Sequence, residues 1–310
     1  MSVGLPYKGS KSEIADELVS KLPPCNKILD ACCGGGAILV TLAQSLKYKS
    51  VVGNDINPAT IKLLDAVLIN KGQIEYEYPE PCSRVDFFNS LQRIENNDFT
   101  IQDCVNKFCA SFGNDGKTYL YGENIEEYKL IAEQMLTSKT LSQRREFYRK
   151  FFSIVTNSEN DKDERLQKLE FVQRLQSLER LERLERLERL ERLERLERLE
   201  RSSIFDLDYS EFDIVYFDIP YKDTNKYDHE FDHEKFYELF SSLKIPAFMS
   251  EYSAPFTCVA EFEKTQLMAA AVGSSKKTTK EKLYFNGTFD EYKILMGPYF
   301  DGKDRQLSFL

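Results

Sequence analysis

The sequence contains no tryptophan, and its 310 residues include only two histidines. It has no apolar run of about 18 residues, the length that a membrane-spanning helix needs, and residues 1–11 lack the apolar core of a signal peptide. These absences argue against a membrane protein, and we expect a soluble protein of the cytoplasm.

Metal-binding patterns are missing as well. The seven cysteines form no paired metal spacing, and an odd number of them fits a reducing compartment. Cys32 and Cys33 are adjacent, and we expect small buried residues there rather than a redox pair. His229 and His233 have a spacing that could hold a metal ion on a helix, but no third ligand accompanies them. We therefore expect no metal site, and a helix over residues 234–243.

Positive charge is scarce, since 51 acidic residues outnumber 42 basic ones and leave a net charge of -9. Binding to nucleic acid draws most of its non-specific affinity from lysine and arginine, so a face that binds nucleic acid must be local. Two basic clusters are candidates: Arg144, Arg145, Arg149 and Lys150, and Lys276, Lys277, Lys280 and Lys282.

The first basic cluster lies in a helical pattern over residues 141–155 and is interleaved with aromatic residues. On a helix, Phe147, Tyr148, Phe151 and Phe152 are expected to fall on one side. The pattern predicts either a helix that contacts nucleic acid or an amphipathic helix with an aromatic core face and a solvated rim.

An acidic side chain follows a strongly apolar segment in the second half of the chain. Residues 212–217 are predicted to form a buried strand that leads into Asp218-Ile219-Pro220-Tyr221. The carboxylate of Asp218 and the carbonyl of Ile219 can each accept a hydrogen bond from the amine of a planar base, and Tyr221 can stack on its ring. Taken alone, this segment could equally be an acidic strand end with a proline turn and a core tyrosine.

A glycine-rich turn lies near the start of the chain. Residues 27–29 are predicted to form a strand, followed by Asp30-Ala31-Cys32-Cys33-Gly34-Gly35-Gly36 and a helical pattern over residues 37–46. This geometry lets the backbone approach a nucleotide-like cofactor. A second predicted strand, residues 51–53, leads to Asp55, where such folds bind ribose hydroxyls. A dinucleotide fingerprint would need a glycine where Leu39 stands, so a nicotinamide cofactor is disfavoured.

Together these motifs resemble the Dam-type family of S-adenosylmethionine-dependent N6-adenine DNA methyltransferases. Residues 218–221 match the catalytic Asp-Pro-Pro-Tyr of that family, continued by Thr224 and Tyr227. Residues 6–11 resemble its N-terminal motif, and residues 250–253 and 281–284 resemble its late motifs.

The resemblance implies roles for individual residues. It places Tyr7 and Lys11 at the methionine end of the cofactor, Asp55 at the ribose, and Asp208 and Tyr209 beside the cofactor adenine. The implied cofactor-binding residues are Tyr7, Lys11, Asp30, Cys32, Gly34, Gly36, Asp55, Asp208 and Tyr209, and the implied catalytic residues are Asp218, Ile219, Pro220 and Tyr221.

Two positions depart from the family pattern. Cys32 stands where the family usually has an aromatic residue, which removes a packing contact to the cofactor. Ile219 replaces the first proline of the catalytic motif, so the turn loses one fixed φ angle but keeps the carbonyl that the amine needs.

The expected fold is of the α/β class, a Rossmann-like S-adenosylmethionine methyltransferase sheet with a mostly helical insertion. Residues 1–70 are the first, cofactor-binding part of the catalytic domain, residues 71–165 an inserted target-recognition region, residues 166–201 a repeat helix, and residues 202–310 the second part with a C-terminal tail. Residues 259–262, 282–285 and 292–296 are predicted to form the antiparallel end of the sheet.

Eight uninterrupted Leu-Glu-Arg triplets occupy residues 178–201. On an α-helix, leucines three positions apart wind around the axis, whereas each Glu meets an Arg four positions later. The pattern predicts a long, solvated helix that serves as a spacer in the insertion. An arm that binds a partner or forms an oligomer is the alternative, because the leucines would be exposed.

The expected reaction moves a methyl group from S-adenosylmethionine to the N6 amine of a flipped adenine in a specific DNA site. The alternatives are an inactive or regulatory DNA-binding relative, and a methyltransferase that acts on RNA or on a protein amide. The expected partners are double-stranded DNA and a cognate restriction endonuclease, in the cytoplasm of a bacterium or encoded by a phage. The tail, Arg305-Gln306-Leu307-Ser308-Phe309-Leu310, weakly resembles a peptide that binds the bacterial sliding clamp, and a chance match is the alternative.

Overall fold

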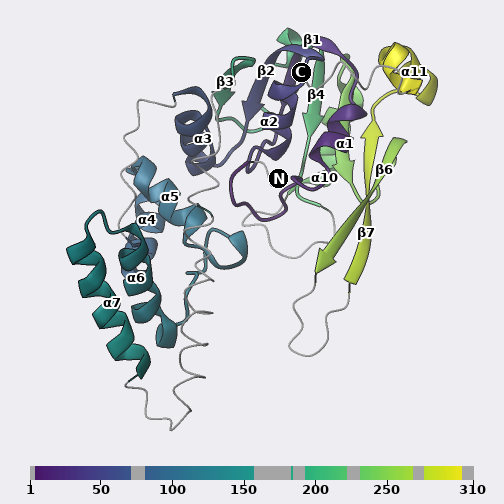
Figure 1. Ribbon diagram of the computed structural model, residues 1–310. Coiled ribbons are helices and arrows are strands. Elements are labelled where there is room, and N and C mark those ends of the chain that lie inside the picture. The colour runs from purple at the N-terminus through teal and green to yellow at the C-terminus, as the bar shows by residue number, and fades with distance from the viewer. Residues whose placement is uncertain are drawn as a thin grey trace. The chain divides into compact units, whose positions relative to one another are not determined.

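The protein divides into two compact units, which we describe separately. A computed structural model describes residues 4–70, 81–156, 183, 193–221, 231–267 and 276–301. The sheet unit comprises Met1–Gly4, Gly9–Ile69 and Glu191–Leu310, and the helical unit comprises Leu5–Lys8 and Asn70–Leu190 (Figure 1). Within these described ranges, no helix has the length and apolarity that crossing a bilayer requires.

The sheet unit is built on seven strands in the order β3-β2-β1-β4-β5-β7-β6 (Figure 1). Neighbouring strands from β3 to β5 are parallel, whereas β7 runs antiparallel to both β5 and β6. The strands are β1 (Cys25–Asp30), β2 (Tyr48–Asn54), β3 (Leu196–Glu200), β4 (Ile214–Phe217), β5 (Ala247–Glu251), β6 (Thr257–Leu267) and β7 (Lys276–Phe285). The expected α/β class is confirmed, and the strand order reverses between β1 and β4, where open α/β sheets bind ligands.

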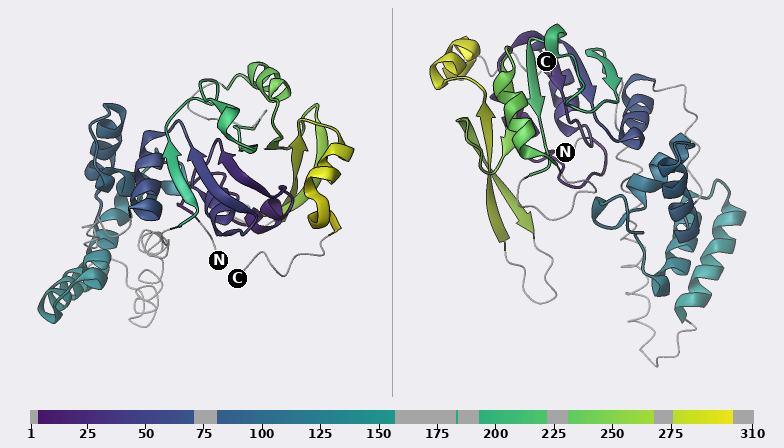
Figure 2. Two further views of the ribbon diagram at one scale, coloured as in Figure 1. Left: turned by 90° about the horizontal axis from the view of Figure 1, so that it is seen from above. Right: turned by 180° about the vertical axis from the view of Figure 1, so that it is seen from behind.

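Helices cover both faces of this sheet (Figure 2). Phe236 and Phe240 of α10 (His233–Ser242) pack with Leu29 and Phe217 on one face. The other face carries α1 (Ala15–Ser20), α2 (Ala37–Gln44) and α11 (Phe289–Met296), where the ring of Tyr292 lies 6.1 Å from that of Phe248. The remaining helical elements are α3 (Pro58–Leu64), which continues into a π turn over Asp65–Ile69, and short 3₁₀ turns at Tyr209–Glu211 and Gly297–Asp301.

The predicted antiparallel end of the sheet is confirmed for residues 259–262 and 282–285 but is wrong for residues 292–296. Those residues end α11. The helix begins with a capping box, in which the Glu291 carboxylate accepts a hydrogen bond from the Thr288 amide at 2.7 Å and the Thr288 hydroxyl accepts one from the Glu291 amide. This Thr-x-x-Glu signature predicts a helix start, and it outweighs the strand-like run of apolar residues that follows.

The end of the Leu-Glu-Arg repeat is a strand, which corrects the prediction of a helix over residues 166–201. Leu196–Glu200 form β3, parallel to β2, and Leu196 is buried. The edge of β2 supplies backbone partners that a helix would not use: the Val51 amide donates to the carbonyl of Arg195 at 2.9 Å. Residues 193–195 and 201 are likewise not helical, whereas Arg183 has helical backbone; the helix prediction for residues 166–182 and 184–192 falls outside the described ranges.

A buried asparagine joins this edge strand to the glycine turn. Asn54 is fully buried, and its amide nitrogen donates to the carbonyls of Ala31 at 2.9 Å and Ser202 at 3.0 Å. Its side-chain oxygen accepts a hydrogen bond from the Ser202 amide at 2.9 Å. One side chain therefore holds the chain that leaves β3 against the turn that follows β1.

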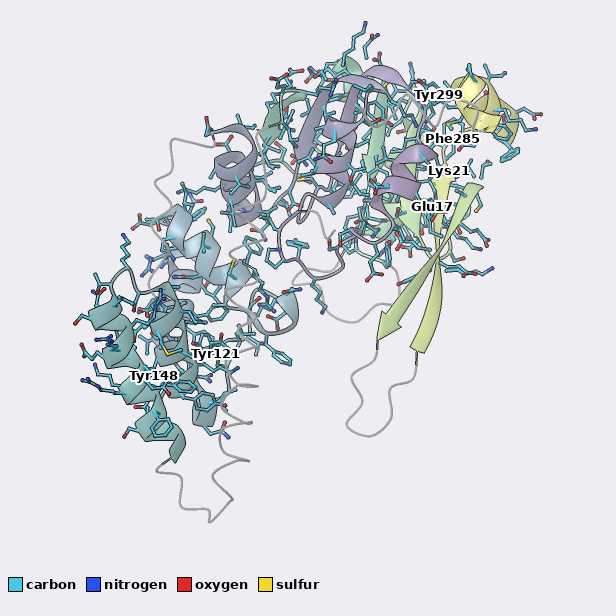
Figure 3. The ribbon with its side chains drawn as sticks, viewed as in Figure 1. Glu17, Lys21, Tyr121, Tyr148, Phe285 and Tyr299 are labelled. Atoms are coloured by element: carbon cyan, nitrogen blue, oxygen red, sulfur yellow. The ribbon has the colours of Figure 1, made fainter. Side chains whose placement is uncertain are left out.

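The described part of the helical unit confirms a mostly helical insertion. Its helices are α4 (Arg84–Glu95), α5 (Ile101–Cys109), α6 (Glu123–Thr137) and α7 (Leu141–Thr156). Capping boxes begin α4 at Ser83 and α5 at Thr100. Tyr119 and Tyr121 are buried and belong, with Phe87, to a hydrophobic core cluster of this unit. Figure 3 labels Tyr121 among these helices and Tyr148 on α7.

The aromatic residues of α7 differ in burial. Phe151 is fully buried and Phe147 is half-buried, whereas Tyr148 and Phe152 are exposed, and their rings stack at 6.2 Å. Successive residues on a helix differ by about 100° in direction, so the four side chains span about 140°, and the core covers only one part of this aromatic side. The four basic residues of α7 are exposed: Arg144, Arg145, Arg149 and Lys150.

We expect Asn54→Ala to lower the free energy of unfolding by about 1–3 kcal/mol, because it leaves buried backbone groups of Ala31 and Ser202 without partners. Urea unfolding followed by circular dichroism measures the change. Asn26→Ala is the matched control, since Asn26 is exposed on β1, and it should change stability by less than about 0.5 kcal/mol. Equal stabilities of the two variants would contradict the joining role of Asn54.

Candidate active site

Carboxyl groups gather at one edge of the sheet. Asp30 ends β1, Asp55 follows β2, Asp218 follows β4, and Glu251 ends β5. Parallel strands bring their carboxyl ends to the same edge. The antiparallel strand β7 adds Glu281, because the next residue along the chain pairs with Glu251.

The glycine turn between β1 and α2 has the backbone that the sequence predicted. Gly34 and Gly36 have φ angles of 47° and 77°, in the left-handed region that favours glycine. At Gly36 a Cβ atom would also lie 2.8 Å from a methyl carbon of Leu64. The turn is held from β2, where the Asn54 carbonyl accepts a hydrogen bond from the Cys33 amide at 2.8 Å.

Asp55 lies directly against this turn. One of its carboxylate oxygens accepts a hydrogen bond from the Gly34 amide and the other accepts one from the Asn57 amide, both at 2.8 Å. Burial raises the pKa of Asp55, and these two amides oppose the rise. The side chain is therefore fixed in position at the end of β2.

Asp30 is a buried carboxyl group whose lost hydration is not replaced by well-formed hydrogen bonds from the described residues. Its exposed fraction is 1%, and neither carboxyl oxygen receives a well-formed hydrogen bond from the described residues. Burial, and then the negative charges of Asp218 and Asp55, raise the pKa of Asp30 well above its ordinary value. Lys11 and the backbone at Cys32 oppose that rise only in part. Such a group favours a cationic donor nearby.

Lys11 carries the positive charge of the site. Its Nζ lies 2.7 Å from Oδ1 of Asp218, 3.3 Å from Oε1 of Glu281 and 4.6 Å from the ring centre of Tyr221. Burial alone would lower the pKa of Lys11, but the two carboxylates outweigh it and raise that pKa. The side chain of Asp218 is 23% exposed, whereas those of Lys11 and Glu281 are 5% and 2% exposed. Asp218 is therefore the member of this cluster that a ligand can reach.

The other residues of the catalytic motif have distinct environments. Ile219 is 2% exposed in the core that contains Phe217 and Phe236. The Pro220 carbonyl lies 2.8 Å from Nε2 of His233. The ring of Tyr221 meets that of Tyr252 edge-on at 4.7 Å, and burial raises the pKa of its hydroxyl well above the usual value.

The pair Asp208 and Tyr209 lies on a short turn before β4. Asp208 is exposed, and its carboxylate caps that turn by accepting a hydrogen bond from the Ser210 amide at 2.9 Å. The Tyr209 ring packs 5.9 Å from that of Phe217. Cys32 packs against the same core cluster as Tyr209.

The structure brings Lys11, Asp30, Cys32, Asp55 and Asp218 within electrostatic reach of one another. Tyr7 belongs to the helical unit, where its ring lies 5.9 Å from that of Phe108. Other predicted positions fall outside the described residues or side chains: Thr224, Tyr227, His229, Lys276, Lys277 and residues 306–310. No group of three or more metal-ligating side chains occurs among the residues described.

Glu281 and His233 contact predicted site residues but were not themselves predicted as site residues. Glu281 belongs to a segment that resembles a late family motif, so its presence in the site could have been inferred from that resemblance. His233 was expected only near the start of a helix. Its contact with Pro220 spans 13 positions and depends on how the chain returns, which no local pattern reports.

Comparison with known proteins bears on this geometry. The sequence model of a family described as D12 class N6 adenine-specific DNA methyltransferase matches residues 7–284. That interval includes the glycine turn, the acidic residues at the sheet edge and the catalytic motif. A search of curated proteins found no match.

We expect Asp30→Asn to stabilise the ligand-free protein by about 1–3 kcal/mol at neutral pH, because the amide cannot ionise and therefore places no negative charge in this buried position. Because folding raises the pKa of Asp30, ionisation of its carboxyl opposes folding above the ordinary aspartate value of about 3.9. The gain should therefore be small near pH 4 and grow as the pH rises toward 8.

Urea unfolding at several pH values measures this dependence. Asp16→Asn, a substitution at an exposed aspartate, is the control and should change stability by less than about 0.5 kcal/mol. A loss of stability in Asp30→Asn at pH 8 would contradict the assignment.

Proposed function

The chain belongs to the D12 class N6 adenine-specific DNA methyltransferases, and from this premise we propose that it moves the methyl group of S-adenosylmethionine to the N6 amine of an adenine flipped out of duplex DNA. The family makes it an adenine-specific DNA methyltransferase. The donor, the flipped base and the residue roles are our proposals.

The observation that carries the proposal is that two carboxyl groups, Asp30 and Asp218, lie close together but differ in burial and in their ionic partners. Asp30 pairs with Tyr216 across β1 and β4, and Asp218 follows two residues later. Asp218 is partly exposed and paired with Lys11, whereas Asp30 is buried without a strong donor. One can accept a hydrogen bond from a substrate amine while the other binds a cationic group of the cofactor.

The residues present fit S-adenosylmethionine. The unpaired carboxyl of Asp30 suits the amino group of its methionine part, and Asp55, held under the glycine turn, suits its ribose hydroxyls. Bound there, the cofactor supplies an electrophilic methyl group on a sulfonium. The residues proposed to hold it are Tyr7, Lys11, Asp30, Cys32, Gly34, Gly36, Asp55, Asp208 and Tyr209.

The catalytic motif prepares the substrate amine. The lone pair of an adenine N6 amine is delocalised into the ring, so the amine is a poor nucleophile. The Asp218 carboxylate and the Ile219 carbonyl each accept a hydrogen bond from one N–H of the amine. These two hydrogen bonds localise the lone pair of the nitrogen toward the reacting carbon. Lys11 donates a hydrogen bond to Oδ1 of Asp218, and we propose that the amine approaches this partly exposed carboxylate. Tyr221 stacks on the base, which must leave the duplex to reach these groups.

The substrate implied by the family is DNA. We propose that Arg144, Arg145, Arg149 and Lys150, exposed on α7, contact phosphates, and that Lys276 and Lys277 do so at the β6–β7 hairpin. A cognate restriction endonuclease and a sliding clamp bound through Gln306 to Leu310 stay predictions, as does a cytoplasmic location. The family match favours DNA over the RNA and protein-amide alternatives.

We expect Asp218→Ala to reduce methyl transfer by about 100- to 1000-fold or more, because the amine loses its charged acceptor. Transfer of tritiated methyl from S-adenosylmethionine to unmethylated DNA measures the rate, and calorimetry measures cofactor binding. Cofactor binding should persist, since Lys11 keeps Glu281 as a partner.

Asp290→Ala is the matched control, because the Asp290 side chain is 88% exposed on α11. It should retain the activity of the unmodified chain. Near-normal turnover by Asp218→Ala would refute the role of Asp218, and a wild-type chain without transfer activity would favour the inactive-relative alternative.

A further inference from the structure

His233 is the first residue of α10, and its side chain contacts the catalytic motif. Its Nε2 lies 2.8 Å from the carbonyl oxygen of Pro220, and its Nδ1 lies 3.0 Å from the carbonyl oxygen of Phe231. The imidazole ring is partly buried and meets the ring of Phe231 edge-on at 5.0 Å. Both partners are carbonyl oxygens, which only accept hydrogen bonds, so each contact is a hydrogen bond when the ring nitrogen facing it carries a proton.

The two contacts differ in the sequence separation that they span. The Phe231 carbonyl is two residues away and belongs to the start of the same helix, whereas the Pro220 carbonyl lies 13 positions earlier. A carbonyl oxygen only accepts hydrogen bonds, so the Nε2 contact holds whenever that nitrogen carries a proton. The Nε2 contact is the one that connects α10 to the catalytic motif.

The position of Pro220 explains why this connection matters. The carbonyl before it, that of Ile219, is the proposed acceptor for the adenine amine, and the residue after it, Tyr221, is the proposed stacking ring. Holding the Pro220 carbonyl fixes the peptide plane between these two groups. A change in that plane turns both the acceptor and the ring.

The helix that carries His233 is well anchored. Asp232 caps it by accepting a hydrogen bond from the Lys235 amide at 3.0 Å. Phe236 and Phe240, one and two turns further on, are fully buried in the core that also holds Ile219. The imidazole therefore connects the motif to a rigid element rather than to a surface loop.

We infer that His233 is a positioning residue for methyl transfer, which holds the Pro220 carbonyl so that the Ile219 carbonyl and the Tyr221 ring face the substrate base. The inference rests on the proposed function. It concerns the orientation of the motif and assigns His233 no contact with the base or the cofactor.

Two amide substitutions separate the contacts. In His233→Gln, the side-chain nitrogen can take the place of Nε2 and donate to Pro220. In His233→Asn, the shorter side chain places its nitrogen near Nδ1, so only the local contact to Phe231 is kept. We expect the Asn variant to lower kcat by about 10- to 100-fold through misplacement of reacting groups, and the Gln variant to stay within about threefold of the wild type.

The experiment measures kcat and KM with unmethylated DNA and tritiated S-adenosylmethionine, cofactor Kd by calorimetry, and the thermal midpoint. A fall in kcat for the Asn variant alone, with cofactor Kd unchanged, supports the inference. Equal kcat values for the Asn variant and the wild type overturn it. Equal losses in both variants, or a parallel loss of cofactor affinity and thermal stability, also overturn it, because they indicate a general structural role. A wild-type chain that transfers no methyl group refutes the proposed function first.

Discussion

The two ion pairs of the buried Lys11 ammonium, with Asp218 and Glu281, are the interactions on which the candidate active site depends. Two unit charges 4 Å apart interact by about 4 kcal/mol at an effective dielectric constant of 20. Asp30, Asp55, Asp218 and Glu281 meet at one sheet edge, and Lys11 is the cation in contact with two of them. Burial, and then the negative charges of Asp218 and Asp55, raise the pKa of Asp30.

The segment that follows the long insertion stabilises this end of the sheet. β3 closes the sheet beyond β2, and the Asn54 side chain ties the chain after β3 to the turn after β1. The backbone around the cofactor turn is thus braced by a segment that follows the insertion. Asn54 lies beside Asp55, so the same strand end supplies both this side-chain connection and the carboxylate that we propose binds ribose.

Sequence reasoning succeeded where the chemistry is local. The glycine turn, Asp55 and the motif after β4 each follow a short apolar strand, and backbone geometry places their side chains at one edge. It failed where the outcome depends on distant partners. Leu196 lies in a repeat that is regular enough for a helix, but the free edge of β2 pairs with it as a strand. The contacts of Glu281 with Lys11 and of His233 with Pro220 join segments that no spacing rule relates.

The two departures from the family pattern have a physical account in the packing. Proline at position 219 would fix one φ angle, and isoleucine does not. Ile219 is instead buried in the same core as Phe217 and Phe236, and the next carbonyl is engaged by His233. The packing of the Ile219 side chain and the hydrogen bond to the Pro220 carbonyl therefore restrict this turn, as the ring of a proline at position 219 would. Cys32 is smaller than an aromatic residue, but it packs against the core cluster that also contacts Tyr209. Position 219 can therefore vary as long as its side chain stays apolar, because the proposed chemistry uses only its carbonyl and the fold buries its side chain.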